Sequence, residues 1–194
     1  LIGAPVADTL SRELEARVER LKAAGVHPTL AIIRVGDRPA DMAYERGAMK
    51  SCEKIGVKVL PFLLNENCAK EEIFSAIQTI NTSPNIHGCL MFRPLPNRTV
   101  EAEAAQLLVP SKDVDGFTCG SLGDLFIGKS GGFPPCTAQA CLEILDYYGY
   151  DVKSARVTVI GASLVIGKPV GVMLLNRCAT LTMCHIDTID TASH

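Results

Sequence analysis

The sequence has 194 residues, of which 47% are hydrophobic and 21% charged, and its formal net charge is −2. This length suits one large or two small domains, and the near-neutral charge gives no bulk electrostatic basis for binding nucleic acid. No apolar run approaches the roughly 18 residues of a membrane span, no stretch has the form of a secretory signal, and the ends at Leu1 and His194 suggest a fragment.

The first part of the chain alternates predicted helices and strands. Apolar residues at helical spacing predict helices at residues 5–24, 41–55, 70–81 and 100–108. Short apolar runs between them predict strands at residues 30–35, 57–64 and 86–92. One face of the first helix is expected to be apolar, with Val6, Leu10, Leu14, Val18 and Leu21.

The second part begins with a Gly-rich stretch over residues 110–135, which predicts a long loop. Beyond it, the pattern predicts a linking helix, a strand, a turn with a helix, and a last strand, at residues 137–148, 155–160, 165–176 and 180–185. Alternation of this kind predicts an α/β fold with parallel sheets and helices on both faces.

The stretch from Val157 to Pro169 is typical of a strand, a glycine turn and a helix start. The β-branched run at 157–160 has the composition of a strand covered on both faces. Gly161 ends the strand, and Gly167 and Pro169 open the helix. Free N–H groups and the helix dipole at such a turn favour an anion. A nucleotide phosphate and a purely structural turn both remain open, because the spacing is Gly-x5-Gly rather than Gly-x-Gly-x-x-Gly.

Ligands of open α/β sheets bind at the carboxyl ends of the strands. Tyr44, Arg93, Asp113 and Asp115 follow predicted strands and could converge in one cleft. Each also has a structural interpretation: Tyr44 on a helix surface, Arg93 in solvent, and the two aspartates in turns.

The eight cysteines include no Cys-x-x-Cys pair. Cys89 and Cys184 lie in apolar runs, as buried free thiols do. The pattern predicts a reducing, cytoplasmic compartment and no metal site, with a disulfide or metal role as the alternative.

Several motifs occur in one order. They are Val35-Gly-Asp-Arg-Pro-Ala40 leading to Tyr44, Pro94-Leu-Pro96, Lys112-Asp-Val-Asp-Gly-Phe117 with Pro135-Cys-Thr137, Gly161 to Pro169, and Ala179 to His185. Together they resemble the methylenetetrahydrofolate dehydrogenase/cyclohydrolase family over roughly two-thirds of a family chain.

The resemblance implies an N-terminal α/β folate-site domain at 1–136 and the first part of a Rossmann-like, doubly wound NAD(P)-binding domain at 137–194. It also implies a homodimer that acts on a small folate. Composition and cysteine usage predict a cytoplasmic protein with no nucleic acid or membrane partner. Family members oxidise 5,10-methylenetetrahydrofolate by hydride transfer to a nicotinamide, and most then hydrate the methenyl product.

The resemblance also assigns roles to individual residues. Tyr44 and Asp115 are the expected catalytic residues, since Tyr44 would orient the folate and Asp115 would bond the pterin. The expected substrate-binding set is Tyr44, Phe92, Pro94, Leu95 and Asp115. The expected cofactor-binding set is Gly161, Ala162, Ser163, Gly167, Ile186 and Asp187.

Three positions depart from the family pattern on the folate side. Ala48 replaces the lysine of Tyr-x-x-x-Lys, Phe92 replaces the glutamine before Pro-Leu-Pro, and Asp41 replaces a serine. Lys50 is six residues after Tyr44, about 600° round a helix instead of the roughly 400° of the family lysine, so it points some 200° away from that lysine's position. These changes predict weak or absent cyclohydrolase activity, with a bifunctional enzyme or a non-catalytic binding homologue as alternatives.

The cofactor side departs as well. Ala162 and Ile186 stand where NADP-using members carry Arg and often Ser. Asp187 lies 20 residues after Gly167, where an acid can accept a bond from a ribose 2′-OH and would repel a 2′-phosphate. The sequence thus predicts NAD, with NADP as the alternative if Asp187 is a solvated turn residue.

Overall fold

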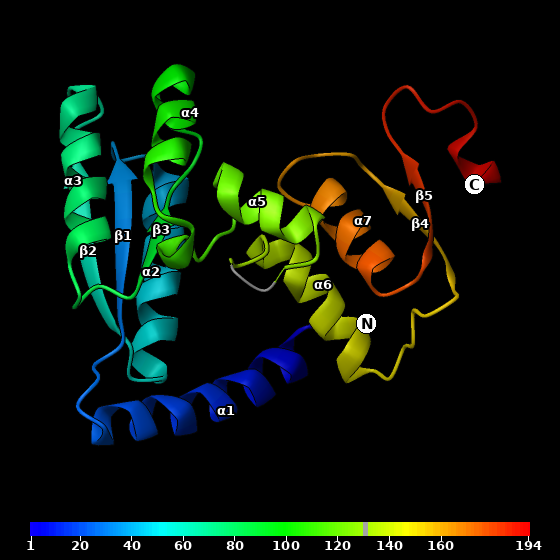
Figure 1. The fold of residues 1–194 in the computed structure, drawn as a ribbon, viewed down its shortest axis with the longest axis horizontal. Coiled ribbons are helices and arrows are strands. Elements are labelled where there is room, and N and C mark those ends of the chain that lie inside the picture. Colours follow the sequence, from blue (N-terminus) through cyan, green and yellow to red (C-terminus); the bar gives the residue numbers. More distant parts are fainter. Residues whose placement is uncertain (130–131) are drawn as a thin grey trace.

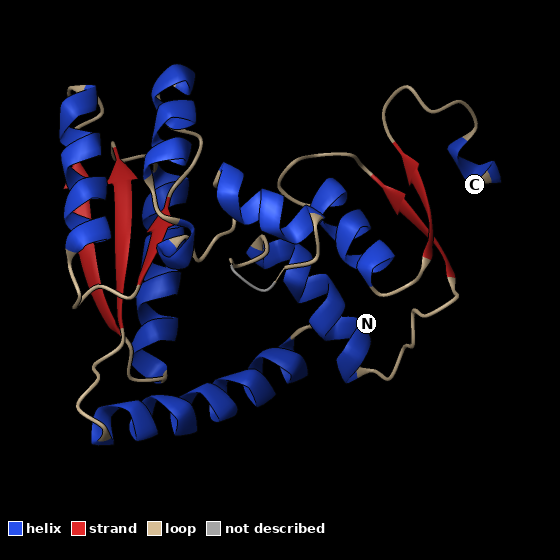
Figure 2. Ribbon diagram, viewed as in Figure 1, coloured by secondary structure: helices blue, strands red, loops and turns tan. Residues whose placement is uncertain are grey.

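The computed structural model describes residues 1–129 and 132–194, in which helices and strands alternate (Figures 1 and 2). The helices are α1 (Ala4–Ala23), α2 (Pro39–Lys54), α3 (Lys70–Thr82), α4 (Arg98–Leu107), α5 (Cys119–Phe126), α6 (Cys136–Tyr147) and α7 (Gly167–Asn176). The strands are β1 (Thr29–Val35), β2 (Lys58–Leu64), β3 (Gly88–Met91), β4 (Arg156–Ile160) and β5 (Thr180–Cys184).

The first sheet has the strand order β2-β1-β3, and every pair is parallel. Ala31, Ile33 and Val35 on one face of β1 join the core formed with α3 and α4. Arg34 points to the other face and bonds Glu45 of α2. Helices therefore cover both faces of this sheet, as the alternating pattern predicts.

The second sheet pairs β4 with β5 in parallel. Helices α6 and α7 form its core through Ala138, Leu142, Val170 and Leu174. The prediction that β4 is covered on both faces is wrong for the described residues, since Ile160 is 75% exposed. Alternate residues of β4 are exposed because the helices that pack against it lie on one side only.

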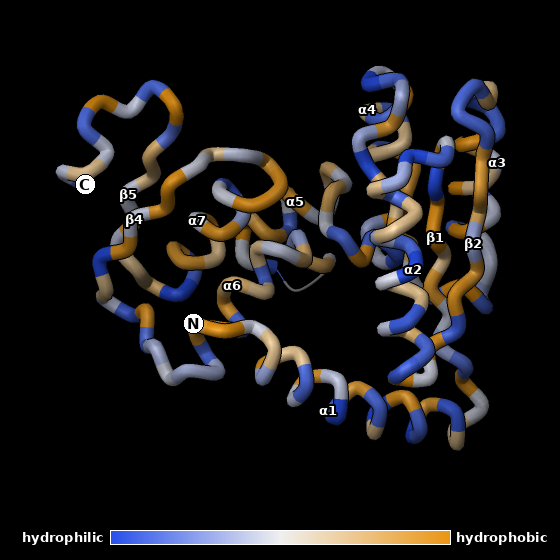
Figure 3. The backbone as a smooth tube through the Cα atoms, turned by 180° about the vertical axis from the view of Figure 1, so that it is seen from behind, coloured by the Kyte–Doolittle hydropathy of each residue, from blue (hydrophilic) through white to orange (hydrophobic). Residues whose placement is uncertain are grey.

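Helix α1 runs beneath both units, with one end near α6 and the other below the first sheet (Figure 1). Tyr148 Oη donates to the Ile2 carbonyl at 3.0 Å, and Asp8 lies 3.5 Å from the Lys54 ammonium. Hydrophilic and hydrophobic colours alternate along α1 (Figure 3). The expected apolar face is only partly buried, since Val6 and Val18 are buried whereas Leu14 and Leu21 are exposed.

The predicted loop at 110–135 is the main error in element assignment. It contains a 3-10 turn at Pro110–Lys112 and helix α5. The Thr118 side chain caps α5 by accepting from Ser121 N at 3.2 Å. Two glycines mask the helix in the sequence, and packing against α7 stabilises it instead of intrinsic propensity.

No helix among the described residues is both long and apolar enough to cross a membrane. Cys89 and Cys184 are buried free thiols, as predicted. Burial, with a smaller effect from Asp113, raises the pKa of Cys89 to about 12.

Candidate functional site

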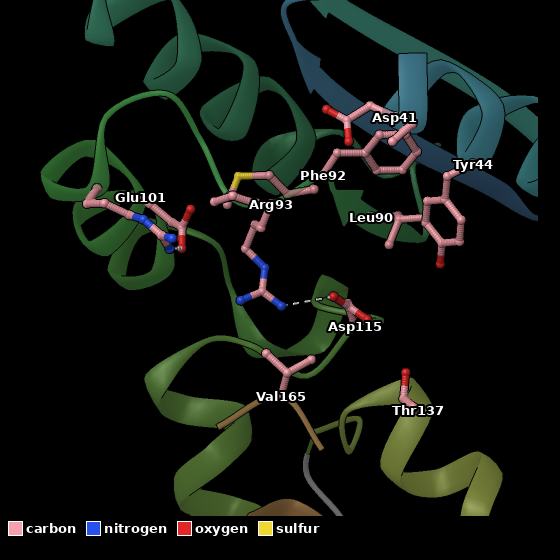
Figure 4. A pocket seen from close by; sticks show the side chains of 13 residues that line it. Asp41, Tyr44, Leu90, Phe92, Arg93, Glu101, Asp115, Thr137 and Val165 are labelled. Carbon is pink, nitrogen blue, oxygen red and sulfur yellow. Dashed lines mark hydrogen bonds and ion pairs between the residues drawn. The ribbon is translucent and has the colours of Figure 1, made fainter. Parts of the chain in front are cut away.

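A cavity of about 480 Å³ lies between the carboxyl end of the first sheet and the second unit. Its lining comes from α2, β3 and the segment after it, α4, the loop before α5, and the second unit. Figure 4 shows Tyr44, Arg93, Asp115, Thr137 and Val165. The two parts of the chain thus contribute to one cleft. A cleft at the ends of parallel strands is where α/β proteins bind ligands.

Tyr44 lines the cleft from α2 and is 60% exposed. Its ring lies 5.1 Å from the Phe92 ring, centroid to centroid, with the planes at 50°. Partial burial, followed by the negative charge of Asp115, raises the pKa of the Tyr44 phenol. The phenol therefore stays protonated at neutral pH, where it can donate a hydrogen bond.

Asp115 is held by a cation that the sequence interpretation placed in solvent. Arg93 Nη2 lies 3.1 Å from Asp115 Oδ2, and the guanidinium lies 4.5 Å from the centre of the Phe117 ring (Figure 4). The solvated interpretation of Arg93 is wrong because the fold brings a carboxylate and an aromatic face to it. The position of Arg93 after a predicted strand indicates a cleft residue, whereas nothing in the sequence pattern indicates that Phe117 contacts it.

Asp113 is fully buried and does not line the cleft. Its Oδ2 accepts from Thr118 N and from Ser121 Oγ, each at 2.8 Å. Lys112 Nζ donates to the carbonyls of Ile80 and Ser83. In the Lys-Asp-Val-Asp motif, Lys112 and Asp113 therefore anchor the loop, and Asp115 lines the cleft.

Two predicted substrate-binding residues, Pro94 and Leu95, follow Arg93 and take different positions. The Arg93–Pro94 bond is cis. Pro94 lines the cleft, and its carbonyl accepts from Arg38 Nη2 at 2.8 Å. Leu95 is 4% exposed and belongs to the core of the first unit. The structure argues against a direct ligand contact for Leu95, because its side chain packs in this core and does not line the cleft.

The residues that depart from the family pattern lie partly inside and partly outside the cleft lining. Asp41 lines the cleft and pairs with Arg38 at 2.7 Å. Neither Ala48 nor Lys50 is part of the cleft lining, and Lys50 is exposed. Helix α2 therefore presents a phenol and a carboxylate to the cleft, and no ammonium group.

The glycine turn after β4 has a backbone that requires glycine. Gly161 has φ +112°, in a region that L side chains rarely adopt. A Cβ on Gly167 would lie 1.7 Å from the Gly161 carbonyl oxygen. Ser163 Oγ accepts from Ile166 N at 3.1 Å, and Val165 reaches the cleft. The two glycines therefore let the turn pack tightly against the start of α7, next to the cleft.

The end of β5 lies beside this turn, since Gly161 N donates to the Cys184 carbonyl at 2.8 Å. Asp187 N donates to His185 Nδ1 at 3.1 Å, and the Asp187 carboxylate is 3.6 Å from the same nitrogen. Ile186 is 98% exposed, and Ala162 lies in the turn itself. An acidic side chain therefore follows the strand adjacent to the turn.

Among residues 1–129 and 132–194, no cluster of three or more His, Cys, Asp or Glu side chains could hold a metal ion. The cleft lining contains a phenol and an Arg–Asp pair, and Cys136 precedes the lining residue Thr137 in the chain. The Cys136 thiol donates to the Val114 carbonyl at 3.1 Å. Burial, followed by the charge of Asp115, raises the Cys136 pKa to about 11, so it is a neutral thiol at physiological pH.

The fold and the cleft define a class: an α/β protein with a Rossmann-like parallel unit whose glycine turn faces a polar cleft on a second α/β unit. A model of the tetrahydrofolate dehydrogenase/cyclohydrolase catalytic domain matches residues 1–115, and a model of the NAD(P)-binding domain matches residues 135–194. The chain therefore belongs to the tetrahydrofolate dehydrogenase/cyclohydrolase family, which confirms the resemblance of its motifs.

Relatives agree with this assignment. The chain is 46% identical to the bifunctional protein FolD of Carboxydothermus hydrogenoformans, over 97% of this chain and 66% of that protein. It is similar to the crystal structure of the bifunctional FolD from Campylobacter jejuni, with TM-score 0.94 and 37% identity over 97% of this chain and 67% of the other.

A third relative is the Trypanosoma brucei enzyme in complex with NADP and an inhibitor, with TM-score 0.89 and 29% identity over 97% of this chain and 64% of that one. The chain spans about two thirds of the length of the curated relatives it matches, for example 66% and 65% of the FolD proteins from C. hydrogenoformans and Clostridioides difficile. The division between 136 and 137 stays a prediction.

Proposed function

We propose that this protein is a methylenetetrahydrofolate dehydrogenase, which transfers a hydride from 5,10-methylenetetrahydrofolate to a nicotinamide dinucleotide. One observation carries the proposal: Tyr44 and Asp115 of the first unit line the same cleft as Val165 of the glycine turn. Hydride transfer needs the two reacting rings held against each other, and most of the rate enhancement can come from that positioning.

On the folate side, Tyr44 packs on the substrate and Asp115 accepts hydrogen bonds from the pterin ring. Phe92 and Pro94 provide apolar walls. The raised pKa of Tyr44 supports a neutral phenol that can donate to the substrate. The proposal gives Leu95 no direct contact, because it packs in the core.

On the other side, Gly161, Ser163 and Gly167 hold the pyrophosphate of the dinucleotide. Gly167 supports this fit, since a Cβ there would lie 1.7 Å from the Gly161 carbonyl oxygen and would force the turn open. When bound, the nicotinamide accepts the hydride, and the methylene carbon of the folate becomes the methenyl cation. The residues of this chain bind and orient the folate and the dinucleotide and exclude water from them. No proton moves in the hydride step.

We propose NAD rather than NADP as the preferred dinucleotide. Ala162 provides no cation for a 2′-phosphate, and Asp187, with Ile186, follows the strand that bonds to the turn. A carboxylate there accepts from a 2′-OH and repels a phosphate. The NADP complex of the T. brucei relative, and an Asp187 that acts only as a solvated turn residue, favour the other outcome.

We further propose that hydration of the methenyl compound is weak. The support is the absence of an ammonium group from α2 in the cleft lining and the contact of Tyr44 with Phe92, which stands where the family glutamine is expected. The second candidate is a fully bifunctional enzyme, which the names of the FolD relatives favour. The third is a binding homologue without catalysis. A cytoplasmic homodimer stays a prediction, and sizing the protein in solution tests the dimer.

One assay distinguishes these candidates. The full-length protein is supplied with 5,10-methylenetetrahydrofolate and NAD, and then with NADP, while nicotinamide reduction and methenyl absorbance are followed together. We expect reduction with NAD at least about tenfold faster than with NADP, the effect of roughly 1.4 kcal/mol, and a methenyl signal that accumulates and decays near its non-enzymatic rate.

Equal or faster turnover with NADP overturns the cofactor proposal. Rapid enzymatic decay of the methenyl signal supports the bifunctional candidate instead. No reduction with either dinucleotide refutes the dehydrogenase. Asp115→Asn provides the matched control for the folate site, since it keeps the size of the side chain and removes the charge that binds the pterin.

A further inference from the structure

The charged groups of the cleft are few. Among the described residues its lining contains two cations, Arg93 and Arg98, and the carboxylates of Asp41, Glu101 and Asp115. The Arg98 side chain is 76% exposed and lies at 3.5 Å from Glu101 on its own helix. Arg93 is therefore the cation that reaches the middle of the cleft (Figure 4). Helix α2 adds no cation to the lining, since Ala48 stands at the position of the family lysine.

Arg93 is held on several sides. Its guanidinium lies 3.1 Å from Asp115 Oδ2 and 4.5 Å from the centre of the Phe117 ring, which is itself buried. Side-chain exposures of 22% for Arg93 and 25% for Asp115 keep this pair partly away from water. An Arg–carboxylate bond in such surroundings is stronger and more directional than one on an open surface.

The backbone that carries Arg93 is fixed as well. The Pro94 carbonyl accepts from Arg38 Nη2 at 2.8 Å, and Leu95 N donates to Glu101 Oε2 at 2.6 Å. The guanidinium therefore approaches Asp115 from an anchored turn. A flexible surface arginine would lose this geometry to side-chain entropy.

We propose that Arg93 is a positioning residue for the folate: its bond to Asp115 Oδ2, together with its contact on Phe117, fixes the carboxylate that binds the pterin ring. The inference rests on the proposed function of the cleft. A carboxylate has about four acceptor positions on two oxygens, so one bond from Arg93 leaves positions for neighbouring N–H donors of a 2-amino-4-oxopyrimidine ring.

The test measures both substrates in the full-length enzyme. For Arg93→Met we expect the KM for methylenetetrahydrofolate to rise about tenfold or more, as for loss of a hydrogen bond to a charged group. The KM for the dinucleotide should stay within about twofold, since Arg93 acts on one ligand only. Arg93→Lys keeps the charge without the planar fork and should recover only part of the loss.

A double-mutant cycle shows whether Arg93 acts through Asp115. In an Asp115→Asn background, Arg93→Met should raise the folate KM by less than about twofold further, because the partner is already lost. Arg177→Met is the matched control, since it removes an arginine from an ion pair with Asp146, at 2.6 Å, outside the cleft. It should leave both KM values unchanged.

Binding of folic acid, measured by calorimetry, separates this inference from the proposed function. If the wild-type protein reduces neither dinucleotide, the dehydrogenase fails, and the loss of folic acid affinity in Arg93→Met still tests the positioning role. An unchanged folic acid affinity in Arg93→Met overturns the inference, as does an effect that persists in full in the Asp115→Asn background. Near-wild-type thermal midpoints establish that the variants fold.

Discussion

Arg34 is a buried cation on β1, with 6% of its surface exposed. Its guanidinium bonds Glu45 of α2, the Asp37 carboxylate and the Gly36 carbonyl. The hydrogen bond with Asp37, and then the bond and charge of Glu45, raise the pKa of Arg34 despite burial. Because Glu45 follows Tyr44 in the chain, this pair fixes the part of α2 that borders the cleft.

Glu45→Gln should destabilise the protein by about 3 kcal/mol, since Arg34 then loses its buried carboxylate partner and keeps only that of the exposed Asp37. Urea unfolding measures the change. Asp37→Asn is the matched control because the Asp37 side chain is 83% exposed, and its loss should cost less than about 1 kcal/mol. Equal stability of Glu45→Gln and the wild type would contradict a role for the pair in holding α2.

The sequence predicted which side chains line the cleft better than it predicted their partners. Tyr44, Phe92, Pro94 and Asp115 reach the cleft as strand-end positions should. The solvated interpretation of Arg93 fails because its partner Asp115 lies 22 residues further along the chain. Only the fold brings such a pair together, and periodicity carries no information about it.

The element that depends most on a single residue is the turn that joins β4 to α7. A Cβ at Gly167 would meet the Gly161 carbonyl oxygen at 1.7 Å, so the turn must open to accept it. Gly167→Ala should raise the dinucleotide KM about tenfold or more. Overpacking should also lower the free energy of unfolding by about 1–3 kcal/mol. Steady-state kinetics and urea unfolding check both expectations.

Gly123→Ala in α5 is the control for that substitution. A Cβ there meets nothing within 4 Å, and the position lies inside a helix. Alanine should leave the dinucleotide KM unchanged and stabilise the protein by up to about 1 kcal/mol. A Gly167→Ala enzyme with normal dinucleotide kinetics would show that the turn does not hold the cofactor.

Periodicity placed most helices and strands to within a few residues, because their apolar faces meet a core. It failed for α5, where glycines hide a helix that tertiary packing stabilises. It also overstated the burial of β4, since a β-branched run does not say how many faces are covered. Local pattern therefore predicts an element, and its neighbours decide its burial.

The whole molecule has two units, each with its own hydrophobic core, and both units line one cleft. The first core contains Ile33, Ile77 and Met91, and the second contains Leu142 and Leu174. Strand–helix alternation predicts two parallel units of this kind. It cannot predict that Val165, from the turn of the second unit, lines a cleft with residues of the first, because no sequence period relates the two.

That contact predicts coupled binding. With Val165 in the cleft and its turn at the proposed dinucleotide site, a dinucleotide that orders the turn should strengthen folic acid binding about fivefold or more, within the usual 1–3 kcal/mol of coupling. Reciprocity requires folic acid to strengthen dinucleotide binding equally. Val165→Ala should reduce both effects, whereas Leu164→Ala, whose side chain is 65% exposed outside the cleft lining, should preserve them. Calorimetric titration of each ligand with and without the other measures the coupling, and identical affinities in both orders would show that the two sites are independent.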